Sequence, residues 1–283
     1  MFGIQNPAVA LRLLAVSETL YPEGRANAVK AALDEYFQGG YEYNLYPRVG
    51  LQPPFIVAKQ GGSVIVWSSG VHTVEQGLGV LLSSSAKMSP VQDGLAGSLY
   101  VQSGLNVYNT LTSLYGGSIE NVLLVGHSYG GSLLSVTASL LVGSNAIRSV
   151  ALTTFGAPRP GDGTFCADLG KVDIARWMCA ADPVPRFPPS WEEAPALTLA
   201  VGFEIARAWS LYGQPHGGLV LYQNGTILEE PLPPLTFPIQ DVKLLAWATG
   251  GGGFLSAEHT LAFYRDRLSK AASMNMAASG RRS

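Results

Sequence analysis

A serine flanked by glycines is the group in this chain best suited to nucleophilic chemistry. It lies in Gly126-His127-Ser128-Tyr129-Gly130, between an apolar run over 121–125 that predicts a buried strand and residues 131–141, where apolar residues recur at helical spacing. A serine at such a strand-to-helix turn exposes its hydroxyl, and its small neighbours relieve the strained backbone. We therefore predict that Ser128 is a nucleophile and that the Tyr129 N–H, at the start of the helix, faces a developing oxyanion.

A serine nucleophile needs a general base, and the chain has only four histidines. In the strand–turn–helix arrangement the acid and the base follow the serine in the chain, which excludes His72. His127 is adjacent to Ser128, and we expect its side chain to point away from the serine. His216, just before a predicted strand, and His259, in a loop that follows four glycines, remain as candidates. The loop position favours His259.

The acid that orients the base is expected at the carboxyl end of a strand, where functional groups gather in parallel sheets. Asp182 follows the buried strand predicted over 174–179, and Pro183 restricts the turn after it. The competing carboxylates are Asp162, in a Pro/Gly loop, and Asp173, which precedes its strand and so would lie at the opposite end. Position and chain order favour Asp182.

Strands that alternate with helices are expected around these residues. In chain order the patterns predict two helices within 7–37, a β-hairpin over 55–67, a helix over 98–116, buried strands over 121–125, 149–155 and 174–179, a hairpin over 219–228 and a helix over 257–271. This alternation implies right-handed crossovers and an α/β fold with a mostly parallel central sheet flanked by helices. We expect one domain over 1–276, with an N-terminal helical extension over 1–50, and a disordered tail over 277–283.

The composition narrows the class of partner. The 283 residues are 47% hydrophobic and 13% charged, with a net charge of −2 and no long basic run, so nucleic acid is not an expected partner. Cys166 and Cys179 predict two reduced thiols rather than a disulfide framework. No metal-ligand spacing is present, and we expect no metal or organic cofactor.

The sequence gives little indication of a compartment. No apolar stretch is long enough to span a bilayer, and the N-terminus lacks the pattern of a signal peptide. A cytoplasmic protein, one exported by a non-classical route and a trimmed secreted protein all fit this pattern.

Six segments share their motifs with one protein family. They are Val91–Leu95, Leu123–Leu133, Thr154–Gly161 (T-F-G-A-P-R-P-G), Ala181–Pro189, His216–Tyr222 and His259–Tyr264. Together they resemble the class 3 (fungal-type) lipase family of α/β hydrolases, from about residue 55 to about residue 268. The segment similar to 259–264 carries that family's catalytic histidine, whereas the histidine of the segment similar to 216–222 is not catalytic. The resemblance therefore implies a triad of Ser128, Asp182 and His259.

The chain departs from the family in the segment before the lid. The family usually has F-R-G-[ST] there, and its last residue completes the oxyanion hole, whereas this chain has Val66-Trp67-Ser68-Ser69-Gly70-Val71 without the arginine. We assign Ser69 as the second oxyanion donor, beside Tyr129, with Gly70 as the alternative. Residues 72–90 lie where the family places its lid, and the apolar segment 195–212 is a second candidate for sheltering the substrate.

The resemblance implies hydrolysis of carboxylic esters, of lipid or acylglycerol type, through an acyl-enzyme on Ser128. The expected partners are a small ester or lipid substrate and, transiently, a lipid interface. Two alternatives remain open: an acyltransferase that uses the same triad, and a catalytically inactive α/β-hydrolase scaffold that only binds. A peptidase is disfavoured because the lipase-type motifs point to esters.

Overall fold

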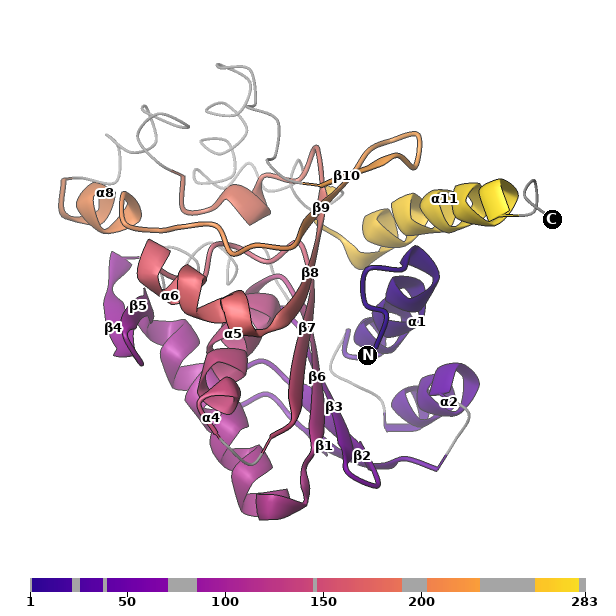
Figure 1. Cartoon of the computed structure of the whole chain (residues 1–283), viewed down its shortest axis with the longest axis horizontal. Helices are drawn as coiled ribbons and strands as arrows, with labels where there is room; N and C mark the ends of the chain where they lie inside the picture. The colour runs from indigo at the N-terminus through magenta and orange to yellow at the C-terminus, as the bar shows by residue number, and fades with distance from the viewer. Residues whose placement is uncertain are drawn as a thin grey trace.

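An eight-stranded sheet forms the centre of the molecule (Figure 1). The computed structural model describes residues 2–21, 26–37, 40–70, 86–144, 147–189, 203–229 and 258–279. In sheet order the strands are β1 (Glu42–Tyr46), β2 (Phe55–Gln60), β3 (Ser63–Ser68), β6 (Asn121–His127), β7 (Ser149–Phe155), β8 (Asp173–Cys179), β9 (Gly218–Leu221) and β10 (Ile227–Glu229). A separate hairpin consists of β4 (Met88–Val91) and β5 (Gly94–Gly97).

The middle of the sheet is parallel and its edges are antiparallel. Strands β3, β6, β7, β8 and β9 pair in parallel, whereas β1–β2, β2–β3 and β9–β10 pair antiparallel. The two hairpins predicted from the sequence are β2–β3 and β9–β10. The mostly parallel sheet flanked by helices is thereby confirmed, and the carboxyl ends of β3, β6, β7 and β8 lie along one edge, where a site can form.

Helices cover both faces of the sheet (Figure 1). On one face lie α1 (Pro7–Glu18), α2 (Ala26–Phe37) and α11 (Leu261–Ser279), and on the other α4 (Ser98–Tyr115), α5 (Tyr129–Val142) and α6 (Gly163–Asp168). The remaining described helices are α8 (Phe203–Trp209) and the short 3₁₀ turns η1 (Gly116–Ser118), η2 (Leu169–Lys171) and η3 (Val184–Arg186). None of the helices in the described ranges is long and apolar enough to cross a membrane.

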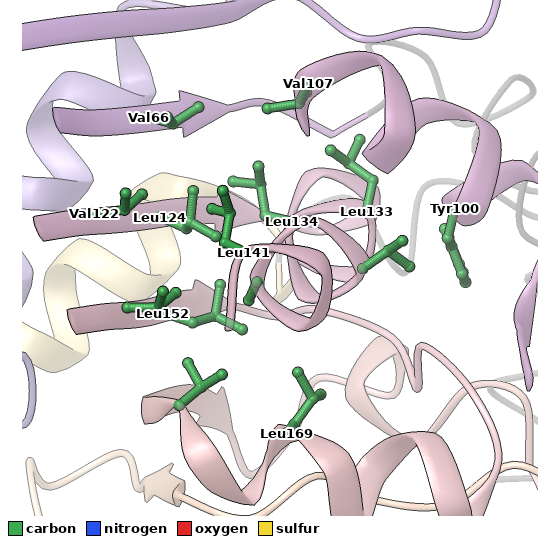
Figure 2. Close-up of a cluster of buried hydrophobic side chains, with 14 of the residues drawn as sticks. Val66, Tyr100, Val107, Val122, Leu124, Leu133, Leu134, Leu141, Leu152 and Leu169 are labelled. Carbon is green, nitrogen blue, oxygen red and sulfur yellow. The ribbon is translucent and has the colours of Figure 1, made fainter. Parts of the chain in front are cut away.

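Two apolar cores result, one on each side of the sheet. Successive side chains of β6 alternate between them: Val122 and Leu124 pack under α4 and α5, and Leu123 and Val125 pack under α1 and α11. Figure 2 shows the first core, where leucines of α5 meet valines and leucines of the strands. Because both faces are buried, the β6 sequence is a continuous apolar run rather than an alternating one.

Some sequence expectations differ from the structure. The expected N-terminal extension over 1–50 is helical only in part, since Glu42–Tyr46 joins the sheet as edge strand β1. The expected tail begins inside α11, which ends at Ser279; residues 280–283 lie outside the described residues. Of the two candidate segments for sheltering the substrate, 72–90 and 195–212, residues 72–85 and 195–202 lie outside the described residues.

Candidate active site

Ser128 occupies a sharp turn between β6 and α5. Its backbone has a φ of 55° and a ψ of −130°, a sparsely populated conformation that costs a non-glycine residue about 1–3 kcal/mol. The turn is tight because a Cβ at Gly126 would collide with the backbone of Gly130 and Gly131. Glycines at these positions let the chain reverse direction over one residue and present the Ser128 hydroxyl at the end of the sheet.

The structure brings the three residues of the expected triad into hydrogen-bond contact. His259 Nε2 lies 2.7 Å from Ser128 Oγ, and His259 Nδ1 lies 2.8 Å from Asp182 Oδ2. A carboxylate only accepts hydrogen bonds, so Nδ1–H donates to Asp182. In the neutral ring this leaves Nε2 without a proton and able to accept the one on Ser128.

Asp182 is held by more than the histidine. Its Oδ1 accepts the Val184 N–H at 2.9 Å, and its Oδ2 also accepts the Tyr264 hydroxyl at 2.7 Å. Burial, and then the negative charge of Asp182, raise the pKa of Tyr264 well above its usual value, so the tyrosine remains a donor. Sequence reasoning missed Tyr264, although its position between Leu261 and Leu268 on the buried side of α11 is an available signal.

A glycine makes room for this junction. Gly156, at the end of β7, has a φ of +60°, and a Cβ there would lie 2.9 Å from Asp182 Oδ2, His259 Cε1 and the Tyr264 hydroxyl. Only a residue without a side chain fits where Asp182, His259 and Tyr264 converge.

The two expected oxyanion donors, Tyr129 and Ser69, differ in their hydrogen bonds. Tyr129 is the first residue of α5, where N–H groups have no partner inside the helix. The Ser69 N–H instead donates to the Pro54 carbonyl at 3.3 Å, and the Ser69 hydroxyl donates to the Gly70 carbonyl at 3.1 Å. Gly70, the alternative, lies against the nucleophile, since a Cβ there would come within 3.2 Å of Ser128 Oγ.

The Tyr129 side chain points away from the site into the α4 side of the sheet. Its hydroxyl donates to the Leu99 carbonyl at 2.9 Å and lies 3.0 Å from the Ser103 hydroxyl, and burial raises its pKa to about 12. Both partners belong to α4, so the buried Tyr129 hydroxyl is hydrogen-bonded within the core.

His127 has a role in the site that sequence reasoning did not foresee. Its ring stacks on that of His259 with centroids 4.9 Å apart, and its Nε2 lies 2.9 Å from the His259 carbonyl oxygen. Tyr21 lies on its other side, with the hydroxyl 2.8 Å from Nδ1. No local sequence signal joins Tyr21 to this site, because the contact spans 106 residues.

The competing candidates lie elsewhere. His216 Nε2 lies 3.3 Å from the Val172 carbonyl, at the amino end of β8, and Asp173 begins that strand. Asp162 caps α6, accepting the N–H groups of Phe165 and Leu95. His72 lies outside the described residues. Within the described ranges, no three His, Cys, Asp or Glu side chains form a group able to hold a metal ion.

Comparisons with known proteins give a family match and several similar folds. Residues 82–191 match the family described as Lipase (class 3). The fold is similar to that of a lipase from Rhizopus microsporus var. chinensis, at 17% identity and a TM-score of 0.51 over 80% of this chain and 75% of that one. It is also similar to lipase II from Rhizopus niveus, at 14% identity and a TM-score of 0.53 over 77% and 78% of the two chains.

A third similar structure is a triacylglycerol lipase whose catalytic centre is described as a serine protease triad. Its identity to this chain is 16% and its TM-score 0.52, over 77% of this chain and 79% of that one. None of the curated proteins compared with the sequence matches it.

The structural similarity shows an α/β-hydrolase fold, and the family match over residues 82–191 supports a carboxylic ester hydrolase of the lipase type. The resemblance to the class 3 lipase family that the sequence motifs indicate is thereby confirmed.

Proposed function

We propose that this protein hydrolyses carboxylic esters of lipid or acylglycerol type through an acyl-enzyme on Ser128. The observation that carries the proposal is the continuous contact from Ser128 Oγ through both ring nitrogens of His259 to Asp182, at 2.7 and 2.8 Å. This is the arrangement in which a serine hydroxyl, weak by itself, becomes a nucleophile. The lipase-type family match supports a lipid ester as the substrate class.

In the first half of the reaction, Ser128 Oγ bonds to the ester carbonyl carbon and its proton moves to His259 Nε2. The negative carbonyl oxygen is stabilised by the Tyr129 N–H, and one such donor contributes about 100- to 1000-fold in rate. The N–H groups of Ser69 and Gly70 donate to the Pro54 carbonyl and to the Tyr21 hydroxyl, so either one acts as a second donor only by leaving its present partner. When the tetrahedral species collapses, the bond to the alkoxy oxygen breaks and His259 gives its proton to the departing alcohol.

In the second half, a water molecule takes the place of the alcohol. His259 accepts a proton from this water as its oxygen attacks the acyl carbon, and returns the proton to Ser128 Oγ as the carboxylic acid leaves. Asp182 keeps the imidazole in the tautomer that both halves need and stabilises its charged form. The hydrogen bonds from Val184 N–H and Tyr264 hold the carboxylate in place for this purpose.

The test combines turnover with labelling. Hydrolysis of p-nitrophenyl esters from acetate to long acyl chains is measured alongside labelling with a fluorophosphonate, in the wild type and in Ser128→Ala. We expect Ser128→Ala to lose both labelling and activity, with a fall in kcat of about 10⁴-fold or more. Ser135→Ala is a matched control, because the Ser135 hydroxyl donates only to the Gly131 carbonyl within the same helix; it should retain both.

Each other result points to a different nucleophile, activity or substrate. An adduct on a residue other than Ser128 refutes the assignment of the nucleophile. Labelling of Ser128 without hydrolysis of any ester in the series favours the acyltransferase, and neither labelling nor turnover favours the binding scaffold. A rate that rises with acyl length supports a lipid ester, since each buried CH₂ contributes up to about 0.8 kcal/mol to binding; a preference for acetate refutes it.

A further inference from the structure

A chain of hydrogen bonds runs behind the triad, through residues that the reaction itself does not use. Tyr21, three residues beyond the end of α1, accepts the Gly70 N–H with its hydroxyl oxygen. The same hydroxyl lies 2.8 Å from Nδ1 of His127, whose Nε2 lies 2.9 Å from the carbonyl oxygen of His259. These hydrogen bonds therefore link Gly70, which lies beside Ser128, to the backbone of His259.

The chemistry of the partners sets the direction of these bonds. The His259 carbonyl only accepts, so His127 Nε2 carries a proton and donates it. Burial, and then the nearby His259, lower the pKa of His127 to about 3, so its ring is neutral near pH 7 and Nδ1 has no proton. Burial raises the pKa of Tyr21, whose hydroxyl therefore donates to Nδ1 while its oxygen accepts from Gly70. Each link has one donor and one acceptor.

Both ends of the chain touch the reacting groups. At one end, the His127 ring stacks on the His259 ring with 4.9 Å between centroids and 29° between planes. At the other end, Gly70 packs against Ser128, since a Cβ on Gly70 would lie 2.6 Å from the Ser128 Cβ. A shift of Tyr21 would therefore move both Gly70 and His259 relative to Ser128.

The neutral state of His127 also suits the proposed reaction. His259 becomes positively charged when it accepts the proton of Ser128, and a second imidazolium stacked on it would oppose that charge. A neutral ring that donates to the His259 carbonyl holds the base without this repulsion.

We propose that Tyr21 and His127 are positioning residues, which hold the base His259 and the segment at Gly70 in register with Ser128. This inference rests on the proposed ester hydrolysis. It makes the segment that follows α1 part of the active site, although α1 lies outside the residues 82–191 that match the lipase family.

The variants separate the links of the chain. Tyr21→Phe keeps the ring and removes the hydroxyl. His127→Leu removes both nitrogens, whereas the amide nitrogen of His127→Gln can still donate to the His259 carbonyl. The matched control is Ser17→Ala in α1, which removes a buried hydrogen bond to the Leu13 carbonyl without touching the chain.

The first readouts are kcat and KM for p-nitrophenyl butyrate, with the concentration of active sites measured by titration with fluorophosphonate. The second readout is the ¹⁵N NMR signature of the His127 tautomer. We expect Tyr21→Phe to lower kcat by about 2- to 13-fold with little change in KM, which is the range for one net hydrogen bond. His127→Leu should lower kcat further and His127→Gln should recover part of the loss. In Tyr21→Phe/His127→Leu the losses should combine to less than their product, because both act through one chain.

The NMR signals should show His127 as the neutral Nε2–H tautomer in the wild type, and Ser17→Ala should keep the wild-type kcat. An unchanged kcat in both Tyr21→Phe and His127→Leu, with normal labelling of Ser128, would overturn the positioning role alone. If His127 in the wild type is protonated on Nδ1, the donors and acceptors assigned to these hydrogen bonds are wrong, and the inference is overturned. A wild type that is neither labelled nor active would overturn the hydrolase itself, and this is seen before any variant is made.

Discussion

The buried, neutral His127 makes the stability of this protein depend on pH in a way that can be calculated. In the unfolded chain its pKa is about 6.5, and in the fold burial and the neighbouring His259 lower the pKa of His127 to about 3. Between these values the unfolded chain binds a proton that the folded protein does not. The free energy of unfolding is therefore highest above pH 6.5 and falls as the pH is lowered toward 3.

The slope is about 1.4 kcal/mol per pH unit, so His127 removes about 2.7 kcal/mol of stability between neutral pH and pH 4.5. The groups that face the ring are Tyr21, His259 and Tyr264. Neither tyrosine titrates in this range, since burial raises the pKa of both. A positive charge on His259 would oppose protonation of His127 and so maintain its low pKa.

The assay is urea unfolding of the wild type and of His127→Gln at pH 7.5, 5.5 and 4.5. Glutamine does not titrate in this range, and the other carboxylates and histidines contribute to both proteins, so their effects cancel in the difference. We expect the wild type to lose about 2.7 kcal/mol more than the variant between pH 7.5 and pH 4.5. A difference that stays constant with pH would refute the reasoning, because it would mean that His127 binds its proton equally well in the folded and unfolded states.

Four further predictions concern the site. Asp182→Asn should lower kcat by about 10⁴-fold, since the amide holds the wrong imidazole tautomer; a nearly wild-type rate would exclude Asp182 as the acid. His259→Ala should cost far more kcat than His216→Ala at equal folded fraction, and the reverse order in that comparison would identify His216 as the base. Tyr264→Phe should lower kcat by about 2- to 13-fold through the loss of one hydrogen bond to the acid, and steady-state kinetics with an unaltered kcat would contradict it. Gly156→Ala should destabilise the fold by at least about 1–2 kcal/mol and reduce kcat, because the new methyl group meets the acid, the base and the tyrosine at once; urea unfolding and kinetics that match the wild type would contradict this.

The sequence predicted the central strands well because each is a buried apolar run bounded by clear breakers. The runs at 121–125, 149–155 and 174–179 became β6, β7 and β8 with small changes at their ends. Strand β1 was missed because Glu42–Tyr46 is a half-exposed edge strand without a continuous apolar run. Its pairing with β2, rather than its own sequence, makes it a strand.

Some residues of the site could likewise be predicted from the sequence and others could not. Ser128 and Asp182 could be grouped from motif, chain order and position at strand ends, whereas His259 was favoured over His216 mainly by the resemblance to the lipase family. The variants above test the roles of all three. The residues that contact this triad from behind could not be found in this way. Tyr21 contacts His127 across 106 residues of sequence, and Tyr264 contacts Asp182 across 82. Such contacts depend on how α1 and α11 lie on the sheet, which periodicity within one segment does not specify.

The packing of α1 against α11 has a consequence for the synthesis of the protein on the ribosome (Figure 1). His259 follows Ser128 by 131 residues, which take roughly 7 to 26 seconds to translate. During that interval α1 has been made, but α11, which packs against its apolar side, has not, so that side of α1 is uncovered in the nascent chain. The same late helix carries Tyr264, which holds the acid. A partly translated chain therefore has Ser128 without His259, and the proposed reaction requires that the second core has closed.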